Sequence, residues 1–175
     1  MSDSKEELKS LVRSIAEDIE AAVDGRLYKL PNGDTKVIDD MEEWKKSEYE
    51  KMACKFKEEH PEDKFDADEM GYDTYQEWME DEIGTAEDVE DPEEMSLYDY
   101  ISDQGLGDDR FEVDSSKELD GGKTLFCYGG PTVWVHDDRV CGYWGCDEEV
   151  CYLASDARDA MMDYFQEQWS YVIDK

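Results

Sequence analysis

The sequence predicts an α+β fold. N-terminal and central short helices with a small hairpin come first, followed by a C-terminal antiparallel meander of about four or five strands packed by a terminal helix. Apolar residues recur at helical spacing near both ends of the chain, whereas from residue 109 onward their period changes to two. We therefore expect a mainly helical, acidic region over residues 1–105 and a sheet-and-helix module over residues 106–175, or one continuous domain.

The clearest helix is predicted over residues 3–24. Ser4 and Glu7 have the spacing of a capping box, and Gly25 stands just past the last apolar residue. Residues that recur every three or four positions would form one apolar face of this helix. They are Leu8, Leu11, Val12, Ile15, Ile19, Ala22 and Val23.

A short hairpin and a second helix are predicted next. Residues 27–30 and 35–38 flank the turn sequence Pro-Asn-Gly-Asp at residues 31–34, which is typical of a four-residue hairpin turn. Asp39 or Asp40 can then cap a helix that runs to about residue 59 before Pro61 ends it. Its inner side would carry Met41, Trp44, Tyr49, Met52, Ala53 and Phe56.

Two or three short amphipathic helices are expected in the central part. Asp73 with Gln76, and Thr85 with Asp88, have the spacing of capping pairs, and Ser96 opens a further apolar turn that Gly105 stops. Aromatic residues at helical spacing would dock these helices, and exposed ones would serve as binding anchors. These aromatics are Tyr72, Tyr75, Trp78, Tyr98 and Tyr100.

The C-terminal part predicts five short strands and one helix. Glycine and aspartate turns separate the strand candidates, and Ser155 opens a segment whose apolar residues return to helical spacing. An antiparallel meander with the helix packed on one face satisfies both patterns. The strand candidates are residues 110–113, 123–128, 132–135, 139–144 and 148–153.

The charge of the chain and its lack of long apolar runs exclude two classes of protein. Its 175 residues contain 50 acidic and 18 basic residues, for a formal net charge of -32 and a pI near 4.1. Direct nucleic-acid binding is excluded because phosphate contacts need Lys and Arg. No apolar run approaches the roughly 20 residues of a membrane-spanning helix. The polar N-terminus also lacks a signal-peptide apolar region, so we expect a cytoplasmic protein.

The sequence nominates no catalytic residue, metal ligand or cofactor, and we expect no enzyme. It has only two histidines and no phosphate-binding glycine loop, and its five cysteines are expected to be reduced thiols. Two weaker alternatives are a zinc site at the three cysteines of residues 141–151 with His136 and a calcium loop over residues 66–77. The cysteine spacing lacks a knuckle pair, and Met70 offers no side-chain oxygen at the fifth loop position.

The negative charge is concentrated in the middle of the chain. Residues 61–110 contain 20 acidic and 2 basic residues. On helices rising about 1.5 Å per residue, this is one charge per roughly 3.75 Å, close to the roughly 3.4 Å per charge of one DNA strand. The expected partner-binding residues are Asp66, Asp68, Glu69, Asp73, Glu77, Glu80, Asp81, Glu82, Glu87, Asp88, Glu90, Asp91, Glu93 and Glu94.

Several C-terminal motifs resemble those of small acidic proteins carried by bacterial phages and integrative elements. These motifs are Ser-Leu-Tyr-Asp-Tyr at residues 96–100, the stretch at 111–118, and Cys-Tyr-Gly-Gly-Pro-Thr-Val-Trp-Val at 127–135. A Gly-Gly-Pro turn before an alternating strand, an aromatic strand at 142–144 and an acidic helix at 156–167 complete the resemblance. By size and acidity the chain is also similar to anti-CRISPR and anti-restriction inhibitors that act as DNA mimics.

These observations favour a host-defence inhibitor, most of all an anti-CRISPR protein acting in the cytoplasm of an infected bacterium. The expected partner is a basic nucleic-acid-binding protein, above all a CRISPR effector nuclease such as Cas9, whose DNA binding or cleavage the acidic surface would block. A variant of this hypothesis moves the contact to the sheet, through Trp134 or Trp144. The alternative is an acidic binding module, chaperone or regulator, for a basic host nucleic-acid-binding protein.

Overall fold

The computed structural model describes residues 2–173 and confirms the α+β class. The chain forms two compact units. The first, which we call the sheet unit, comprises residues 1–37 and 93–175, and the second, the inserted unit, comprises residues 38–92. This division differs from the predicted boundary at residue 105, because the N-terminal helix packs on the C-terminal sheet.

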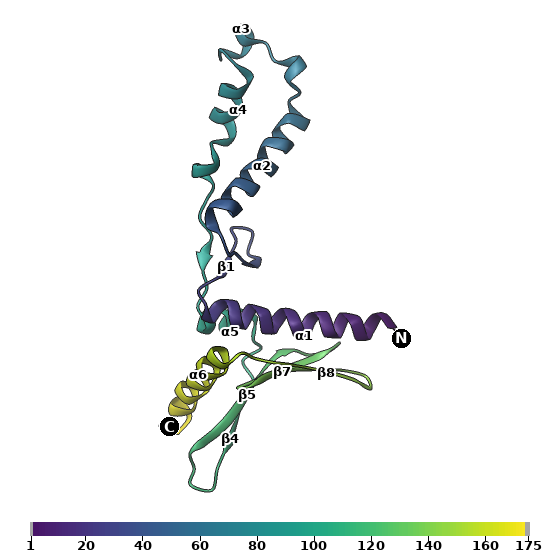
Figure 1. The fold of residues 1–175 in the computed structure, drawn as a ribbon, viewed down its shortest axis with the longest axis vertical. Coiled ribbons are helices and arrows are strands. Elements are labelled where there is room, and N and C mark those ends of the chain that lie inside the picture. The colour runs from purple at the N-terminus through teal and green to yellow at the C-terminus, as the bar shows by residue number, and fades with distance from the viewer. Residues whose placement is uncertain (1, 174–175) are drawn as a thin grey trace. The chain divides into compact units, whose positions relative to one another are not determined.

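The main sheet of the sheet unit is an antiparallel meander with the strand order β4-β5-β6-β7-β8, as predicted (Figure 1). Strand β5 begins earlier than predicted, and its pairing with β4 and with β6 is interrupted by one irregularity each. The strands are β4 (Asp109–Val113), β5 (Leu119–Cys127), β6 (Thr132–His136), β7 (Arg139–Trp144) and β8 (Asp147–Tyr152).

Two long helices pack on one face of this sheet, α1 (Ser2–Val23) across β7 and β8 and α6 (Ser155–Ile173) on β5. The close approach depends on glycine. A Cβ atom at Gly142 would lie 2.5 Å from Val12 Cγ2, and one at Gly122 would lie 2.6 Å from Phe165 Cγ. The predicted terminal helix on one sheet face is thus confirmed, and α1 shares that face with it.

A small second sheet belongs to the same unit. It contains the predicted hairpin, β1 (Leu27–Lys29) and β2 (Thr35–Val37), and a third strand, β3 (Glu93–Glu94), that the sequence did not indicate. The strand order is β2-β1-β3, so residues 38–92 leave from one side of β1 and return on its other side. The inserted unit is therefore an insertion within this small sheet.

Helix α5 (Leu97–Gln104) completes the sheet unit. Ser96 and Asp99 form a capping box at its start and Gly105 ends it, which confirms the predicted limits. Tyr100 is buried, and its hydroxyl donates a hydrogen bond to Asp18 Oδ2 of α1 at 3.2 Å. This contact fastens α5 to α1.

The inserted unit is helical, and its two longest helices, α2 (Met41–Glu59) and α4 (Tyr75–Ile83), lie side by side (Figure 1). Asp40 caps α2 through the backbone N–H of Glu43, as predicted. A short helix α3 (Ala67–Met70) and two 3-10 turns, η1 (Glu62–Lys64) and η2 (Ala86–Asp88), connect and follow them. The expectation of short central helices is confirmed.

Three local predictions are wrong. Helix α1 already includes Ser2, so Ser4 lies inside the helix and is not its N-cap. Thr74 caps α4, in place of Asp73, because its hydroxyl accepts the N–H of Glu77. Met52 lies on the exposed side of α2, with 41% of its surface accessible.

None of the helices over residues 2–173 has the length and apolar character needed to cross a membrane.

The substitution Gly122→Ala should reduce the free energy of unfolding by about 1–3 kcal/mol, because the new methyl group would overlap the buried ring of Phe165. Urea denaturation measures this change. Gly130→Ala is the matched control, since no atom lies within 4 Å of a Cβ there. Equal stability of the two variants would contradict the packing of α6 on β5.

Candidate acidic interface

The longest stretch without a basic residue runs from residue 65 to residue 109. Its part within the inserted unit, residues 65–92, contains 12 acidic residues and no Lys, Arg or His. We call this part the acidic segment. Because its own sequence supplies no cation, its carboxylates can be neutralised only by basic residues elsewhere in the chain, by solvent ions or by a partner.

All fourteen predicted partner-binding residues are exposed to solvent. Only Asp91 among them forms an ion pair with a described residue, Lys45, whose Nζ lies 2.6 Å from Asp91 Oδ1. The remaining negative charges are therefore available to an external cation, as a surface for basic proteins requires.

Local hydrogen bonds fix several of these carboxylates in place. Asp66 caps α3 by accepting the N–H groups of Asp68 and Glu69. Asp88 accepts the hydroxyl and backbone N–H of Thr85 in a capping box, and these hydrogen bonds hold its pKa below the usual value. The predicted pairing of Thr85 with Asp88 is thus confirmed, although it opens a single 3-10 turn.

Helix α4 presents a preorganised acidic side. Tyr72 donates its hydroxyl to Asp81, and this hydrogen bond raises the pKa of the tyrosine above its usual value. Gln76 Nε2 donates to Glu80 at 2.6 Å. Since these donors are neutral, they orient the carboxylates and leave their negative charge in place.

A cluster of aromatic rings holds α4 against α2. The ring of Trp78 lies edge-on to that of Phe56, with centroids 5.0 Å apart, and stacks on that of Phe65 at 5.8 Å. Tyr75 is buried beside them and donates its hydroxyl to the carbonyl of His60. Most of the predicted aromatics therefore dock helices, whereas Tyr98 of the sheet unit is exposed at 48%.

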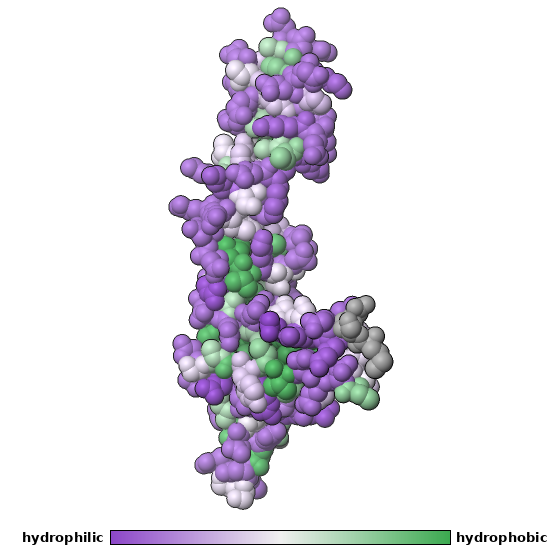
Figure 2. Space-filling view, turned by 45° about the vertical axis from the view of Figure 1, so that its right-hand side comes forward, coloured by the Kyte–Doolittle hydropathy of each residue, from purple (hydrophilic) through white to green (hydrophobic). Residues whose placement is uncertain are grey.

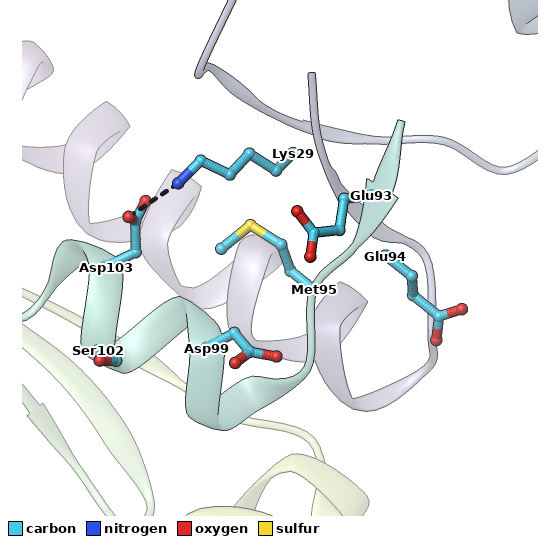
Figure 3. A pocket seen from close by; sticks show the side chains of 7 residues that line it. All are labelled: Lys29, Glu93, Glu94, Met95, Asp99, Ser102 and Asp103. Carbon is cyan, nitrogen blue, oxygen red and sulfur yellow. Dashed lines mark hydrogen bonds and ion pairs between the residues drawn. The ribbon is translucent and has the colours of Figure 1, made fainter. Parts of the chain in front are cut away.

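Two of the fourteen residues, Glu93 and Glu94, belong to the sheet unit, where they form β3. They help to line a cavity of about 270 Å³ with Met95 and residues of α5. Figure 3 shows Lys29 reaching across this cavity to Asp103, with 3.0 Å between Nζ and Oδ1. This hydrogen bond lowers the pKa of Asp103. The expected surface is thus divided between two units, with twelve of its residues on the inserted one.

The face of the main sheet that points away from the helices has a different character, which the sequence analysis missed. Val133 and Val135 are buried in the core, so Trp134 between them faces the other side. Arg110 and Lys123 lie over its ring, at 4.6 and 4.9 Å from the centroid. The cross-strand register of β4, β5 and β6 was the missing information.

The residues of the two weaker metal hypotheses have other positions or roles. Asp66 of the calcium-like stretch caps α3, and Gly71 ends that helix in a left-handed conformation. Cys151 pairs with Val140, the neighbour of Cys141, so the two cysteines face opposite sides of the sheet. Over residues 2–173, no group of three or more His, Cys, Asp or Glu side chains is placed to hold a metal ion.

Exposed apolar residues are scattered over the surface outside the acidic segment, among them Leu106, Tyr128 and Tyr152. On the face drawn in Figure 2, hydrophilic residues predominate and hydrophobic ones form separate small patches. No protein-family model, curated protein or solved structure matches the chain.

The substitution Phe56→Ala should unfold the inserted unit while the sheet unit stays folded. Removing a buried phenylalanine costs about 3–5 kcal/mol, which is comparable to the whole stability of a small domain. Hydrogen exchange measured residue by residue would show lost protection in α2 and α4 only. Met52→Ala, an exposed position on the same helix, is the control. Retained protection of α4 in Phe56→Ala would contradict the role of the aromatic cluster.

Proposed function

We propose that the protein is a host-defence inhibitor of the anti-CRISPR kind, which binds the nucleic-acid channel of a CRISPR effector nuclease and excludes DNA. The observation that carries this proposal is the acidic segment, where exposed carboxylates are preorganised and only Asp91 forms an ion pair with a described residue. Effector nucleases hold nucleic acid in a positively charged channel, which is the complementary surface.

The charge density of α4 supports the proposal. Its nine residues span about 14 Å of helix axis. They carry four carboxylates, Glu77, Glu80, Asp81 and Glu82, or one per roughly 3.4 Å. One strand of DNA presents one phosphate per roughly the same distance. A basic channel that fits phosphates would therefore meet a similar number of charges along this helix.

The electrostatics also favour rapid encounter with such a channel. The inserted unit has 22 acidic and 6 basic residues, and all six bases precede residue 65. Complementary fields raise association rates, and at physiological salt they act over roughly 8 Å. The acidic segment, rather than the lysine-bearing helix α2, is thus the side that would steer the encounter.

The outer face of the main sheet is a poorer candidate for the same contact. Arg110 and Lys123 surround Trp134 there, and like charges across an interface with a basic channel are unfavourable. Trp144 packs against the core of the sheet unit. These positions weigh against contact through Trp134 or Trp144.

Charge reversal tests the acidic segment. Changing Glu69, Glu82, Glu87 and Glu90 to Lys should weaken inhibition of DNA binding by the effector roughly tenfold or more, because repulsion replaces attraction. These carboxylates form no hydrogen bond or ion pair with a described residue, so the fold should survive. Inhibition is measured by competition with labelled target DNA at two salt concentrations.

The control for this reversal has the same change in net charge. It replaces Glu112, Asp120, Asp159 and Asp163, four exposed acids of the sheet unit, with Lys. The control should inhibit nearly as well as the unmodified protein. If both variants lose inhibition equally, total charge matters and the acidic segment has no special role. If the protein binds a basic host protein but leaves DNA binding by the effector unchanged, the alternative partner class is supported.

Removal of the inserted unit should separate folding from inhibition. Strands β2 and β3 lie on either side of β1, about 10 Å apart at the usual strand spacing. A linker of about six Gly and Ser residues can reach roughly 20 Å and therefore replace residues 38–92. The product should keep the circular dichroism and cooperative melting of a folded sheet unit but should not inhibit. Full inhibition without residues 38–92 would overturn the proposal.

A further inference from the structure

A second cavity, of about 350 Å³, lies in the sheet unit between α5 and the paired strands β4 and β5. Tyr98 and Ile101 of α5 line it together with Leu106, Asp109, Thr124 and Tyr164. None of these six residues is among the fourteen of the candidate interface. The cavity is thus a separate feature of the molecule.

Two buried polar atoms at this cavity have no hydrogen-bond partner among the described residues. They are Oδ1 of Asp109 and Oγ1 of Thr124, which come from residues paired directly across β4 and β5. Thr124 is only 1% exposed. A buried polar atom without a partner is costly and rare in folded proteins. Two such atoms at one cavity favour the binding of a polar group from outside the chain.

The chemistry of the two atoms defines that group. Asp109 Oδ2 accepts the hydroxyl of Tyr164 at 3.2 Å, which leaves Oδ1 to accept from another donor. An ionised carboxylate only accepts, whereas the threonine hydroxyl can do either. The missing group must therefore donate, and a cation would also balance the carboxylate charge.

No basic side chain of the described residues supplies this cation. Arg110, the neighbour of Asp109, pairs with Asp108 and lies over Trp134 on the other face of the sheet. Lys29, the cation bound to α5, pairs with Asp103 at the first cavity. The donor must come from another molecule.

A guanidinium group fits the walls better than an ammonium group. It is flat, its five N–H donors are held in a fork, and it is weakly hydrated, so one group can reach both Asp109 and Thr124. The rings of Tyr98 and Tyr164 meet edge to face with centroids 5.8 Å apart, and aromatic walls favour a delocalised cation. The side chains of Ile101 and Leu106 offer apolar contact to an alkyl stem.

We propose that this cavity binds a guanidinium group on an alkyl stem, either the arginine side chain of another protein or a small alkylguanidine. The site does not depend on the inhibitor function, because all its residues belong to the sheet unit. Asp109 receives the charged donor, Thr124 accepts a second N–H, and the rings of Tyr98 and Tyr164 form an aromatic wall beside the group.

Binding is tested by titration calorimetry and by chemical-shift changes of the full chain with capped arginine, capped citrulline and methylguanidine. Citrulline has the shape of arginine without its charge, so it should bind roughly tenfold more weakly or worse. If capped arginine binds more tightly than methylguanidine, the natural ligand is a protein side chain. If methylguanidine binds more tightly, the natural ligand is a small molecule. Capped lysine should bind more weakly than capped arginine.

Variants separate the site from the general attraction of cations to an acidic protein. Asp109→Asn should weaken the binding of capped arginine roughly tenfold or more. Asp108→Asn makes the same charge change one residue away and should leave this binding unchanged. Thr124→Val should weaken binding without lowering the melting temperature, because it removes an unpartnered hydroxyl. This second variant keeps the test decisive if Asp109→Asn fails to fold.

Three results would overturn the proposal. They are equal binding of arginine and citrulline, equal loss in the Asp108 and Asp109 variants, and no binding of capped arginine up to about 10 mM. The last result would mean that the cavity holds only water.

Discussion

Electrostatic self-repulsion is the constraint on which the rest of this structure depends. With a net charge of -32, the chain must hold like charges close together. Among the fourteen candidate acids, only Asp91 has its charge balanced by an ion pair with a described residue. In the inserted unit, the contact of Trp78 with Phe56 and Phe65 opposes this repulsion. The stabilisation gained by burying aromatic rings does not depend on the charge of the surrounding surface. The aromatic contacts therefore favour a rigid charged surface, which the proposed mimicry of a row of phosphates requires.

Features determined by neighbouring residues were predictable from sequence. The hairpin at residues 27–37, the cap at Ser96 and the five-stranded meander each depend on turn chemistry or on local period. Features that depend on distant segments were not. The pairing of β3 with β1 and the packing of α1 on β7 both join parts of the chain separated by many residues, and two-residue β3 has no period to detect.

The same distinction applies to the candidate sites. Exposure of the fourteen acids was predictable, because an unpaired carboxylate is costly to bury. The cavity at Asp109 was missed, because it combines α5, α6 and a cross-strand pair. A signal was present nevertheless: Asp109 is in phase with Phe111, whose side of β4 faces the core. A carboxylate in phase with the apolar residues of a strand indicates a built polar site.

The insertion between β2 and β3 has a consequence for the order of folding. Pairing β3 with β1 closes a loop of more than sixty residues, and the entropic cost of closure grows with the length of flexible chain. When the inserted unit folds first, its helices shorten the flexible part of that loop to a few residues. A folded inserted unit would therefore also lower the entropic cost of pairing the last strand of the small sheet with β1.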